Sequence, residues 1–421
     1  MKVAEAFSLK SGQTLRNRIA KAAMTEGLAG RDGLPNQDHV RLYRRWAAGG
    51  LGLSITGNVQ IDRAHLERPG NVIVDGPLTI DAKAAWARWA EAARADGTRA
   101  IVQISHAGRQ TQKAVNPSPK APSAVPLALP GGQFGMPVPL LESEITVLIA
   151  RFAHAAVVSR EAGFDGVQVH AAHGYLISQF LSPLANRRTD AWGGSLENRA
   201  RFLVEAVKAV RAAAGADFLL SVKLNSADFQ KGGFAFDDCI AVAGWLKNLG
   251  VDLLEISGGT YEQPRMMDME GLEARDEPAQ ASTRAREAYF VDLAKALMTG
   301  QTPPLLVTGG FRTLRSMENA AQNGIAMVGV GRPLCAAPEC VAELLEGHSD
   351  ELPRPEDSLA IGPGWLGPRS PIKLVRTMNG FAAQSWYYQQ LRHIASGRDA
   401  VSGLNPFNAF LAENRENKAR S

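Results

Sequence analysis

Short apolar segments and amphipathic segments alternate along most of this chain, and that alternation limits its fold more than any other feature of the sequence. The first cycle is an apolar segment over residues 18–23, an amphipathic one over 40–47 that stops at Gly49 and Gly50, and a second apolar segment over 51–59. Short apolar segments rich in β-branched residues are typical of buried strands. We expect further strands over residues 100–105, 166–169, 218–224, 251–257, 304–308 and 325–330. We expect helices over residues 79–95, 145–152 and beyond, 196–214, 236–249, 285–299 and 314–323.

Repeated strand–helix units predict a parallel sheet covered by helices, either closed into a barrel or open and doubly wound. No G-x-G-x-x-G motif follows the strand over 18–23, as an open dinucleotide-binding sheet would require, and polar groups end several different strands. The 421 residues also fit a barrel of roughly 250 residues with long loops. We therefore predict an α/β fold of the TIM (β/α)8 type over residues 1–348, with a C-terminal extension over 349–421.

Two stretches depart from the alternation. Residues 107–141 are rich in proline, glycine, serine and alanine, and we expect this long loop to run over the active-site face. A linker rich in proline, glycine and acidic residues begins at Ser349, and a helix is expected from Ser370 to Gly397 with an aromatic cluster over 386–388. Such a stripe packs in a core or at an interface between subunits of a homo-oligomer, and a wall of the substrate pocket is the alternative.

Residues 166–175 bring two histidines and a tyrosine to the end of one predicted strand. His170 ends the strand, and His173 and Tyr175 follow it in a polar loop. Barrel enzymes place catalytic groups in this way, although an H-x-x-H pair alone can equally be a solvated loop. Metal binding would need a third ligand such as Asp190 or Glu197, and the spacing lacks the helical H-E-x-x-H pattern. We therefore predict no metal site here.

Glycine-containing turns follow the last two predicted strands. They are Gly309–Gly310 and Gly331–Arg332. The loops after strands 7 and 8 of a TIM barrel commonly bind phosphate through backbone N–H groups, and an arginine adds charged donors. Either pair alone could simply turn the chain, but together they predict a phosphate site.

The ordered motifs of the chain resemble the signature of the Old Yellow Enzyme family of FMN-dependent ene-reductases over roughly residues 1–345. The motifs are KAAMT at 21–25, QISHAGR at 103–109, HAAHGYLISQFLSP at 170–183, NRRTD at 186–190, WGGSLENR at 192–199, the Gly309–Gly310 turn and GRP at 331–333. The resemblance implies an FMN cofactor reduced by NADH or NADPH. It further implies that hydride passes from flavin N5 to an activated alkene, while His170 and His173 bind the carbonyl oxygen and Tyr175 protonates the α-carbon.

The resemblance also assigns FMN contacts to residues in the order of the chain. The implied cofactor-binding residues are Ala23, Met24, Thr25, Gly57, Gln103, His170, Lys223, Gly309, Gly310, Gly331 and Arg332. Lys223 stands where relatives usually carry arginine, which would alter the flavin redox potential, and Gly57 stands where alanine is usual, which would leave more room. Amine demethylation, reduction of quinones or flavins, and flavin binding without catalysis remain alternative functions on the same scaffold.

Charge and cysteine content exclude several other classes of protein. Lysine and arginine total 46 against 42 acidic residues, and the charges are interspersed, so we predict no nucleic-acid partner. No apolar run approaches the ~20 residues of a membrane span, and the N-terminus lacks a secretory signal, so we expect a soluble cytoplasmic protein. Three cysteines without C-x-x-C spacing exclude the iron–sulfur extension that larger members of the family carry.

Overall fold

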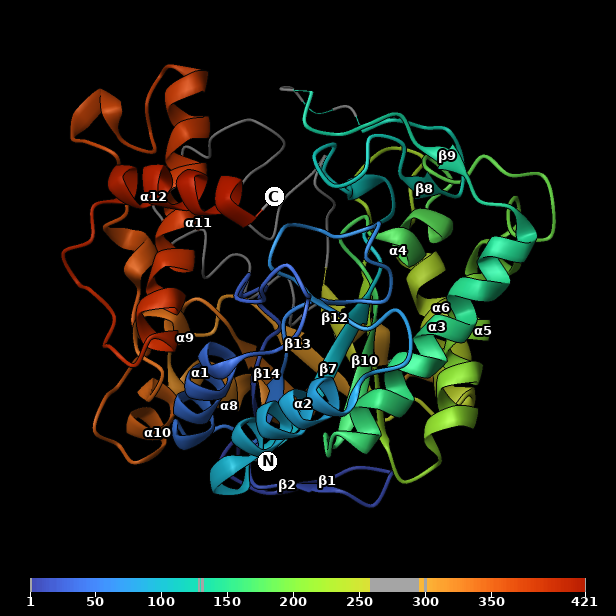
Figure 1. Cartoon of the computed structure of the whole chain (residues 1–421). Coiled ribbons are helices and arrows are strands. Elements are labelled where there is room, and N and C mark those ends of the chain that lie inside the picture. The colour runs from blue at the N-terminus through green and yellow to red at the C-terminus, as the bar shows by residue number, and fades with distance from the viewer. Residues whose placement is uncertain (1, 128, 130–131, 258–294, 299–300, 421) are drawn as a thin grey trace.

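The computed structural model describes residues 2–127, 129, 132–257, 295–298 and 301–420. Within these residues, eight parallel strands form a closed barrel in the order β10-β11-β12-β13-β14-β3-β4-β7, and β7 pairs with β10 to close it (Figure 1). The strands are β3 (Ile19–Lys21), β4 (Leu53–Ile55), β7 (Arg99–Ser105), β10 (Gly166–Ala171), β11 (Leu219–Asn225), β12 (Leu253–Ser257), β13 (Leu305–Thr308) and β14 (Met327–Val330). The predicted TIM barrel is therefore confirmed.

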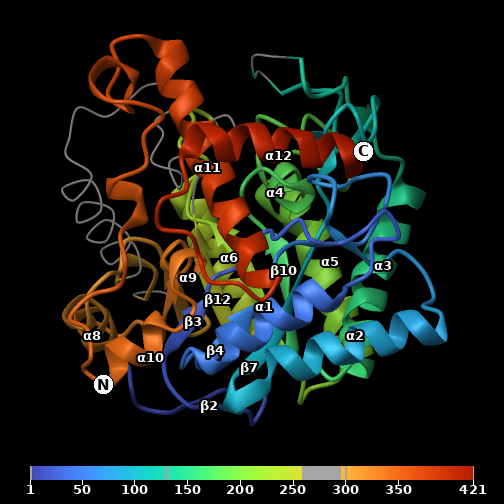
Figure 2. The same cartoon turned by 60° about the vertical axis from the view of Figure 1, so that its left-hand side comes forward.

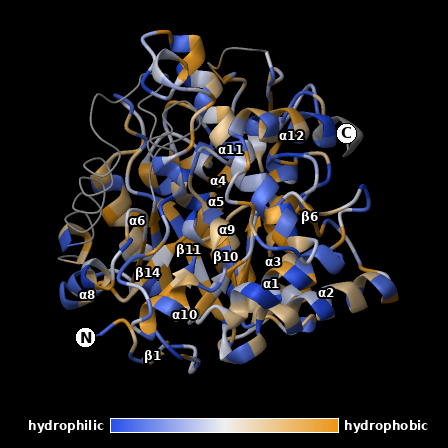
Figure 3. Cartoon of the chain, turned by 90° about the vertical axis from the view of Figure 1, so that its left-hand side faces the viewer, coloured by the Kyte–Doolittle hydropathy of each residue, from blue (hydrophilic) through white to orange (hydrophobic). Residues whose placement is uncertain are grey.

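Helices surround the barrel. They are α1 (Gln37–Ala48), α2 (Ile80–Ala93), α3 (Glu142–Glu161), α5 (Leu196–Ala214), α6 (Phe236–Asn248), α8 (Leu314–Gln322), α9 (Pro333–Ala336) and α10 (Cys340–Leu345). Side chains cap several of them: Thr79 accepts from the Ala82 N–H, and Ser195 accepts from the Asn198 N–H. Figure 3 shows hydrophobic residues gathered in the central strands and interspersed with hydrophilic ones along peripheral helices such as α1 and α2.

The interior of the barrel changes from apolar to polar along the strands. Near their amino ends the strands turn Leu53, Ile101, Leu219, Leu253, Leu306 and Met327 inward, and the hairpin of β1 (Phe7–Ser8) and β2 (Thr14–Leu15) contributes Leu9 and Leu15 to the same cluster. Alternate residues of a strand point to the same side. The inward positions toward the carboxyl ends are polar, among them Gln103, Gln168, Lys223 and Glu255. The polar half of the interior is therefore the half that can hold a site.

Several boundaries differ from those expected. The apolar segment over 51–59 is not one strand, because the chain leaves β4 near Gly57 and continues as β5 (Val59–Gln60), which pairs with β6 (Val72–Ile73). The loop after β10, expected to be polar, contains the short buried helix α4 (Leu176–Leu181). Most of the helix expected over 285–299 lies outside the described residues.

The long loop over 107–141 lies toward the carboxyl ends of the strands, as expected. It begins with a 3-10 turn (Gly108–Gln110) and pairs β8 (Lys120–Ala121) with β9 (Val138–Pro139). In Figure 1 β8 and β9 lie at the end opposite the β1–β2 hairpin.

The C-terminal extension folds into the long helix α11 (Lys373–Ala395) and a second helix, α12 (Pro406–Arg420). The expected helix is confirmed as α11, whereas α12 was not predicted. α11 packs against α1 and α9 of the barrel, and α12 crosses α11 (Figure 2). Glu413 of α12 is 4% exposed and forms an ion pair with the buried Arg68, whose guanidinium carbon lies 3.8 Å from the centre of the Tyr388 ring. None of the described helices is long and apolar enough to span a bilayer.

Candidate active site

The predicted catalytic side chains His170, His173 and Tyr175 come together at the carboxyl end of β10. The centre of the His170 ring lies 5.1 Å from that of His173 and 4.8 Å from that of Tyr175, and both contacts are edge to face. His173 has a φ of +60°, a left-handed conformation that costs energy in a residue with a side chain and recurs at functional sites. Its backbone is held from both sides, because its N–H donates to Asn225 Oδ1 at 3.1 Å and its carbonyl accepts from Gln110 Nε2 at 3.0 Å.

Both histidines are neutral at physiological pH. Burial lowers the pKa of His170 well below its usual value, and the neighbouring His173 and Lys223 lower it further. Burial, followed by Lys223, does the same to the pKa of His173. His170 Nδ1 accepts a hydrogen bond from the Ala172 N–H at 3.2 Å, so the ring proton is on Nε2. The His173 Nε2 atom lies 2.6 Å from Ser257 Oγ. His170 therefore presents a fixed N–H donor.

Tyr175 is 4% exposed and adjoins a polar chain of side chains. Asn58 Nδ2 donates to the Tyr175 hydroxyl oxygen at 3.4 Å and to Glu67 Oε2 at 2.9 Å. The Thr25 hydroxyl donates to the same Glu67 oxygen at 2.7 Å. The sequence analysis did not single out Asn58 or Glu67. Their only signal was position: Asn58 lies near the end of the segment expected as a strand over 51–59, and Glu67 lies in the loop between β5 and β6.

A second polar chain crosses the inside of the barrel. Lys223 Nζ forms an ion pair with Glu255 Oε1 at 2.9 Å, and both side chains are at most 5% exposed. The Thr308 hydroxyl donates to Glu255 Oε1 at 2.7 Å, and Gln168 Nε2 donates to Glu255 Oε2 at 2.9 Å. Gln103 Nε2 donates to Gln168 Oε1 at 2.7 Å. The predicted cofactor residues Gln103 and Lys223 thus belong to one network, which is centred on a carboxylate that the sequence analysis missed.

The segment after β3 carries the predicted contacts Ala23, Met24 and Thr25. These three residues are half-buried between fully buried neighbours. The expectation of extra room at Gly57 is wrong. A Cβ at residue 57 would lie 2.3 Å from Glu26 Oε2 and 2.5 Å from the Met24 carbonyl oxygen. The Glu26 carboxylate, which accepts from the Gly57 N–H at 3.1 Å, already fills the space that a methyl group would take.

The two glycine turns predicted to bind phosphate lie side by side. Gly309 and Gly310 follow β13, and Gly331 and Arg332 follow β14, its parallel neighbour. Gly309 and Gly310 have φ angles of +125° and +84°, which favour glycine.

Unpaired polar atoms lie next to these turns and provide a test of whether FMN fits. Arg312 Nε and Glu356 Oε2 are buried and have no hydrogen-bond partner among the described residues. Buried polar atoms are nearly always paired, so a polar ligand is expected at this point. A phosphate ester with hydroxyl groups supplies both acceptors and donors. The residues present therefore fit the ribityl phosphate of FMN.

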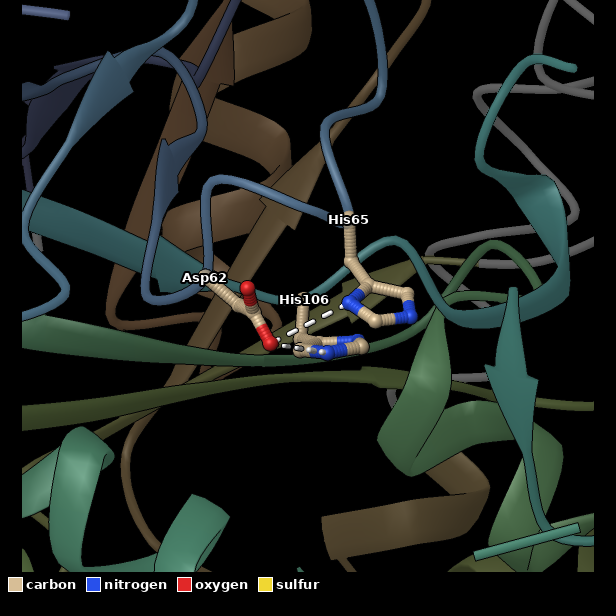
Figure 4. Close-up of side chains that lie close together, drawn as sticks. All are labelled: Asp62, His65 and His106. Carbon is tan, nitrogen blue, oxygen red and sulfur yellow. Dashed lines mark hydrogen bonds and ion pairs between the residues drawn. The ribbon is translucent and has the colours of Figure 1, made fainter. Parts of the chain in front are cut away.

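Asp62, His65 and His106 form the group of described His, Cys, Asp and Glu side chains placed close enough to share a metal ion (Figure 4). Hydrogen bonds from backbone N–H groups show which ring nitrogens of the two histidines carry protons. His65 Nε2 accepts from the Lys120 N–H at 2.9 Å, and His106 Nδ1 accepts from the Gly108 N–H at 3.1 Å. The ring nitrogens that face Asp62, at 3.1 and 3.7 Å, therefore carry protons and have no lone pair for a metal.

An arginine from α3 also contacts the Asp62 carboxylate. Arg151 Nη1 lies 3.0 Å from the Asp62 carboxylate oxygen that faces the two imidazoles. The cluster is therefore a carboxylate held by N–H groups of His65 and Arg151, with the His106 imidazole stacked on that of His65. It ties the loop after β5 to the end of β7 and to α3.

Because His106 is buried and neutral, we expect the protein to lose stability in mild acid. Burial, followed by the neighbouring His65, lowers the pKa of His106 to about 4, against about 6.5 in an unfolded chain. Between these values the unfolded state binds more protons, so the free energy of unfolding falls as the pH falls from 6.5 to 4. We expect a loss on the order of 3 kcal/mol from His106 alone, measured by urea unfolding at pH 7.5, 5.5 and 4.5.

Two variants check this assignment. His106→Asn should reduce the dependence of the free energy of unfolding on pH, with the contributions of His170 and His173 remaining, whereas His348→Asn, at a side chain that is 71% exposed, should leave it unchanged. A free energy of unfolding that stays constant from pH 7.5 to 4.5 would contradict the expectation.

Comparison with known proteins places the chain among flavin enzymes. Residues 4–351 match the sequence model described as the NADH:flavin oxidoreductase / NADH oxidase family. The chain is 40% identical over 360 residues to the NADH-dependent flavin oxidoreductase iliE of Hypocrea jecorina, covering 81% of this chain and 88% of that protein. It is 38% identical over 353 residues to the NADH-dependent flavin oxidoreductase iccE of Talaromyces variabilis, covering 80% and 84%.

Solved structures give the same grouping. The Old Yellow Enzyme homologue from Zymomonas mobilis superposes with a TM-score of 0.69 at 25% identity, covering 85% of this chain and 96% of that one. Morphinone reductase superposes with a TM-score of 0.67 at 26% identity, covering 85% and 92%.

Proposed function

The chain belongs to the NADH:flavin oxidoreductase / NADH oxidase family, and on that premise we propose that it reduces the C=C bond of α,β-unsaturated carbonyl or nitro compounds. It is an FMN-dependent NAD(P)H oxidoreductase of the Old Yellow Enzyme type. Because the relatives iliE and iccE are named NADH-dependent, we propose NADH as its reductant.

The proposal rests on one observation, the convergence of His170, His173 and Tyr175 above the polar half of the barrel interior. An alkene activated by a carbonyl or nitro group needs donors for the oxygen that gains charge and an acid for the α-carbon. Two neutral imidazoles and a phenol within six residues can supply these donors and this acid.

The imidazoles stabilise the charge that develops during reduction. When bound, FMN reduced by the nicotinamide would supply the hydride that the β-carbon of the alkene receives. His170 Nε2–H is fixed by the Ala172 N–H and donates to the substrate oxygen. Because the site is buried and the donor is already oriented, the hydrogen bond gains more in the transition state than in the bound substrate. Removal of one such donor typically costs about 3 kcal/mol.

Tyr175 supplies the proton. A phenol with a reference pKa of about 10 stays protonated at neutral pH. As it loses its proton to the α-carbon, negative charge develops on its oxygen, and Asn58 Nδ2 lies 3.4 Å away to stabilise that charge. Glu67 accepts from the same amide nitrogen at 2.9 Å and so keeps the donor end of Asn58 turned toward this site.

Separate measurement of the two half-reactions tests the proposal. Protein reconstituted with FMN and reduced anaerobically by NADH is mixed with a cyclic enone, a nitro-olefin, a quinone or buffer, and flavin reoxidation is followed by its absorbance. We expect the enone and the nitro-olefin to reoxidise the flavin with formation of saturated products. Reoxidation by the quinone alone would reject alkene reduction and favour the quinone alternative.

A further inference from the structure

The C-terminal extension is fastened to the segment that follows the Gly309–Gly310 turn. Arg312 Nη2 forms an ion pair with Glu356 Oε1 at 2.5 Å, and the side chains are 5% and 13% exposed. The Leu352 N–H donates to the Arg312 carbonyl at 2.7 Å, and the backbones of Thr313 and Glu351 form an antiparallel β-bridge. The matched region of the family ends at residue 351, so Glu356 lies outside it.

Helix α11 brings a tyrosine to the same place. Tyr387 packs edge to face against Trp386, with ring centres 5.2 Å apart, and it contacts the barrel core where α11 packs on α9. Burial raises its pKa, and the groups that act electrostatically on it include Arg332, Glu356 and Arg312. The phenol is therefore a protonated donor on the helix that packs against α9, and α9 begins directly after Gly331 and Arg332.

Three polar atoms at this meeting point have no hydrogen-bond partner among the described residues. They are the Tyr387 hydroxyl, Arg312 Nε and Glu356 Oε2. The first two are donors and the third is an acceptor. The two donors favour a ligand that accepts hydrogen bonds, such as a phosphate, and the Glu356 acceptor suits a ligand that also carries hydroxyl groups.

We propose that the C-terminal extension completes the phosphate end of the FMN site, and that the Tyr387 hydroxyl is a hydrogen-bond donor to the FMN phosphate. The inference rests on FMN as the cofactor and does not require alkene reduction. Glu356 has a positioning role, because its ion pair holds Arg312 beside the Gly309–Gly310 turn.

Binding of two flavins to the apoprotein tests the proposal. FMN and riboflavin share the ring and the ribityl chain but differ in the phosphate. Tyr387→Phe keeps the ring and removes only the hydroxyl. We expect its Kd for FMN, measured by quenching of flavin fluorescence, to rise about tenfold to a hundredfold, as for the loss of one hydrogen bond to a charged group. Its Kd for riboflavin should stay within about twofold of that of the unmodified protein.

Tyr388→Phe is the matched control. Tyr388 is the next residue of the same helix, but its ring packs against Arg68, away from the two arginines of the phosphate turns. It should bind both flavins normally, and the melting temperature of each apoprotein shows whether it is folded. Equal weakening of FMN and riboflavin by Tyr387→Phe, no weakening of FMN, or the same loss in both variants would each overturn the proposal. Turnover with an enone at saturating FMN is a separate readout, so failure of the proposed function would leave these binding results intact.

Discussion

Replacement of Tyr175 with phenylalanine is expected to lower the turnover of weakly activated enones by about 10² or more, as for the loss of a general acid. Reduction of the flavin by NADH should persist, because hydride transfer from the nicotinamide needs no proton from Tyr175. The Tyr175 ring packs edge to face on His170 and should keep its place without the hydroxyl. The variant therefore removes a proton donor and little else.

Stopped-flow absorbance separates the two steps. The reductive half-reaction is measured with NADH and the oxidative one with an enone, and Tyr388→Phe serves as a remote tyrosine control. An unchanged rate of flavin reoxidation by the enone in Tyr175→Phe would remove Tyr175 from its role. Equal losses in both half-reactions would instead indicate damage to flavin binding.

Replacement of Glu255 with leucine is expected to destabilise the protein by roughly 3–5 kcal/mol, because it leaves Lys223 charged and buried without its partner. The loss should be larger than that of an apolar truncation of similar size, since Gln168 and Thr308 also lose their acceptor. Urea unfolding of the apoprotein at neutral pH measures the change.

A double variant isolates the charge effect. Lys223→Met combined with Glu255→Leu removes both members of the ion pair and should recover much of the lost stability, since apolar pairs often replace buried ion pairs without loss. Lys223→Met is also measured alone. If the loss of stability in the double variant equals the sum of the losses in the two single variants, then the two charges are independent and the network does not act as described.

The barrel could be predicted because its signal is local. Each buried strand is a short apolar run, and each helix has its own start and stop residues, as at Ser195 and Gly215. The His170 to Tyr175 group was also predictable, since all three side chains lie within six residues and one strand end places them together.

The partners of these residues were not predictable in the same way. Glu255 stands in the apolar strand LLEIS, which indicates only that a buried acid needs a partner. Lys223 becomes the partner of Glu255 only through the register between β11 and β12, and that register is set by the closed barrel. Gly57 was misread for a similar reason, because the carboxylate that fills its space comes from Glu26, on a different loop.

The second C-terminal helix escaped prediction because its sequence is mostly polar and its few apolar residues show little periodicity. Among its described residues, Ala409 is the one buried in a hydrophobic cluster, and a further buried contact is made by the charged Glu413, whose partner Arg68 is far away in the sequence. A pattern of apolar residues carries no information about such a pairing.

The Arg68–Glu413 ion pair also has a consequence for how the protein is made. The two residues are separated by 345 positions. At a translation rate of roughly 5–20 residues per second, Arg68 leaves the ribosome about 17–70 s before its carboxylate partner. The residue before it, Glu67, orients the Asn58 amide at Tyr175. In the nascent chain Arg68 therefore lacks its Glu413 partner until the final helix has been synthesised.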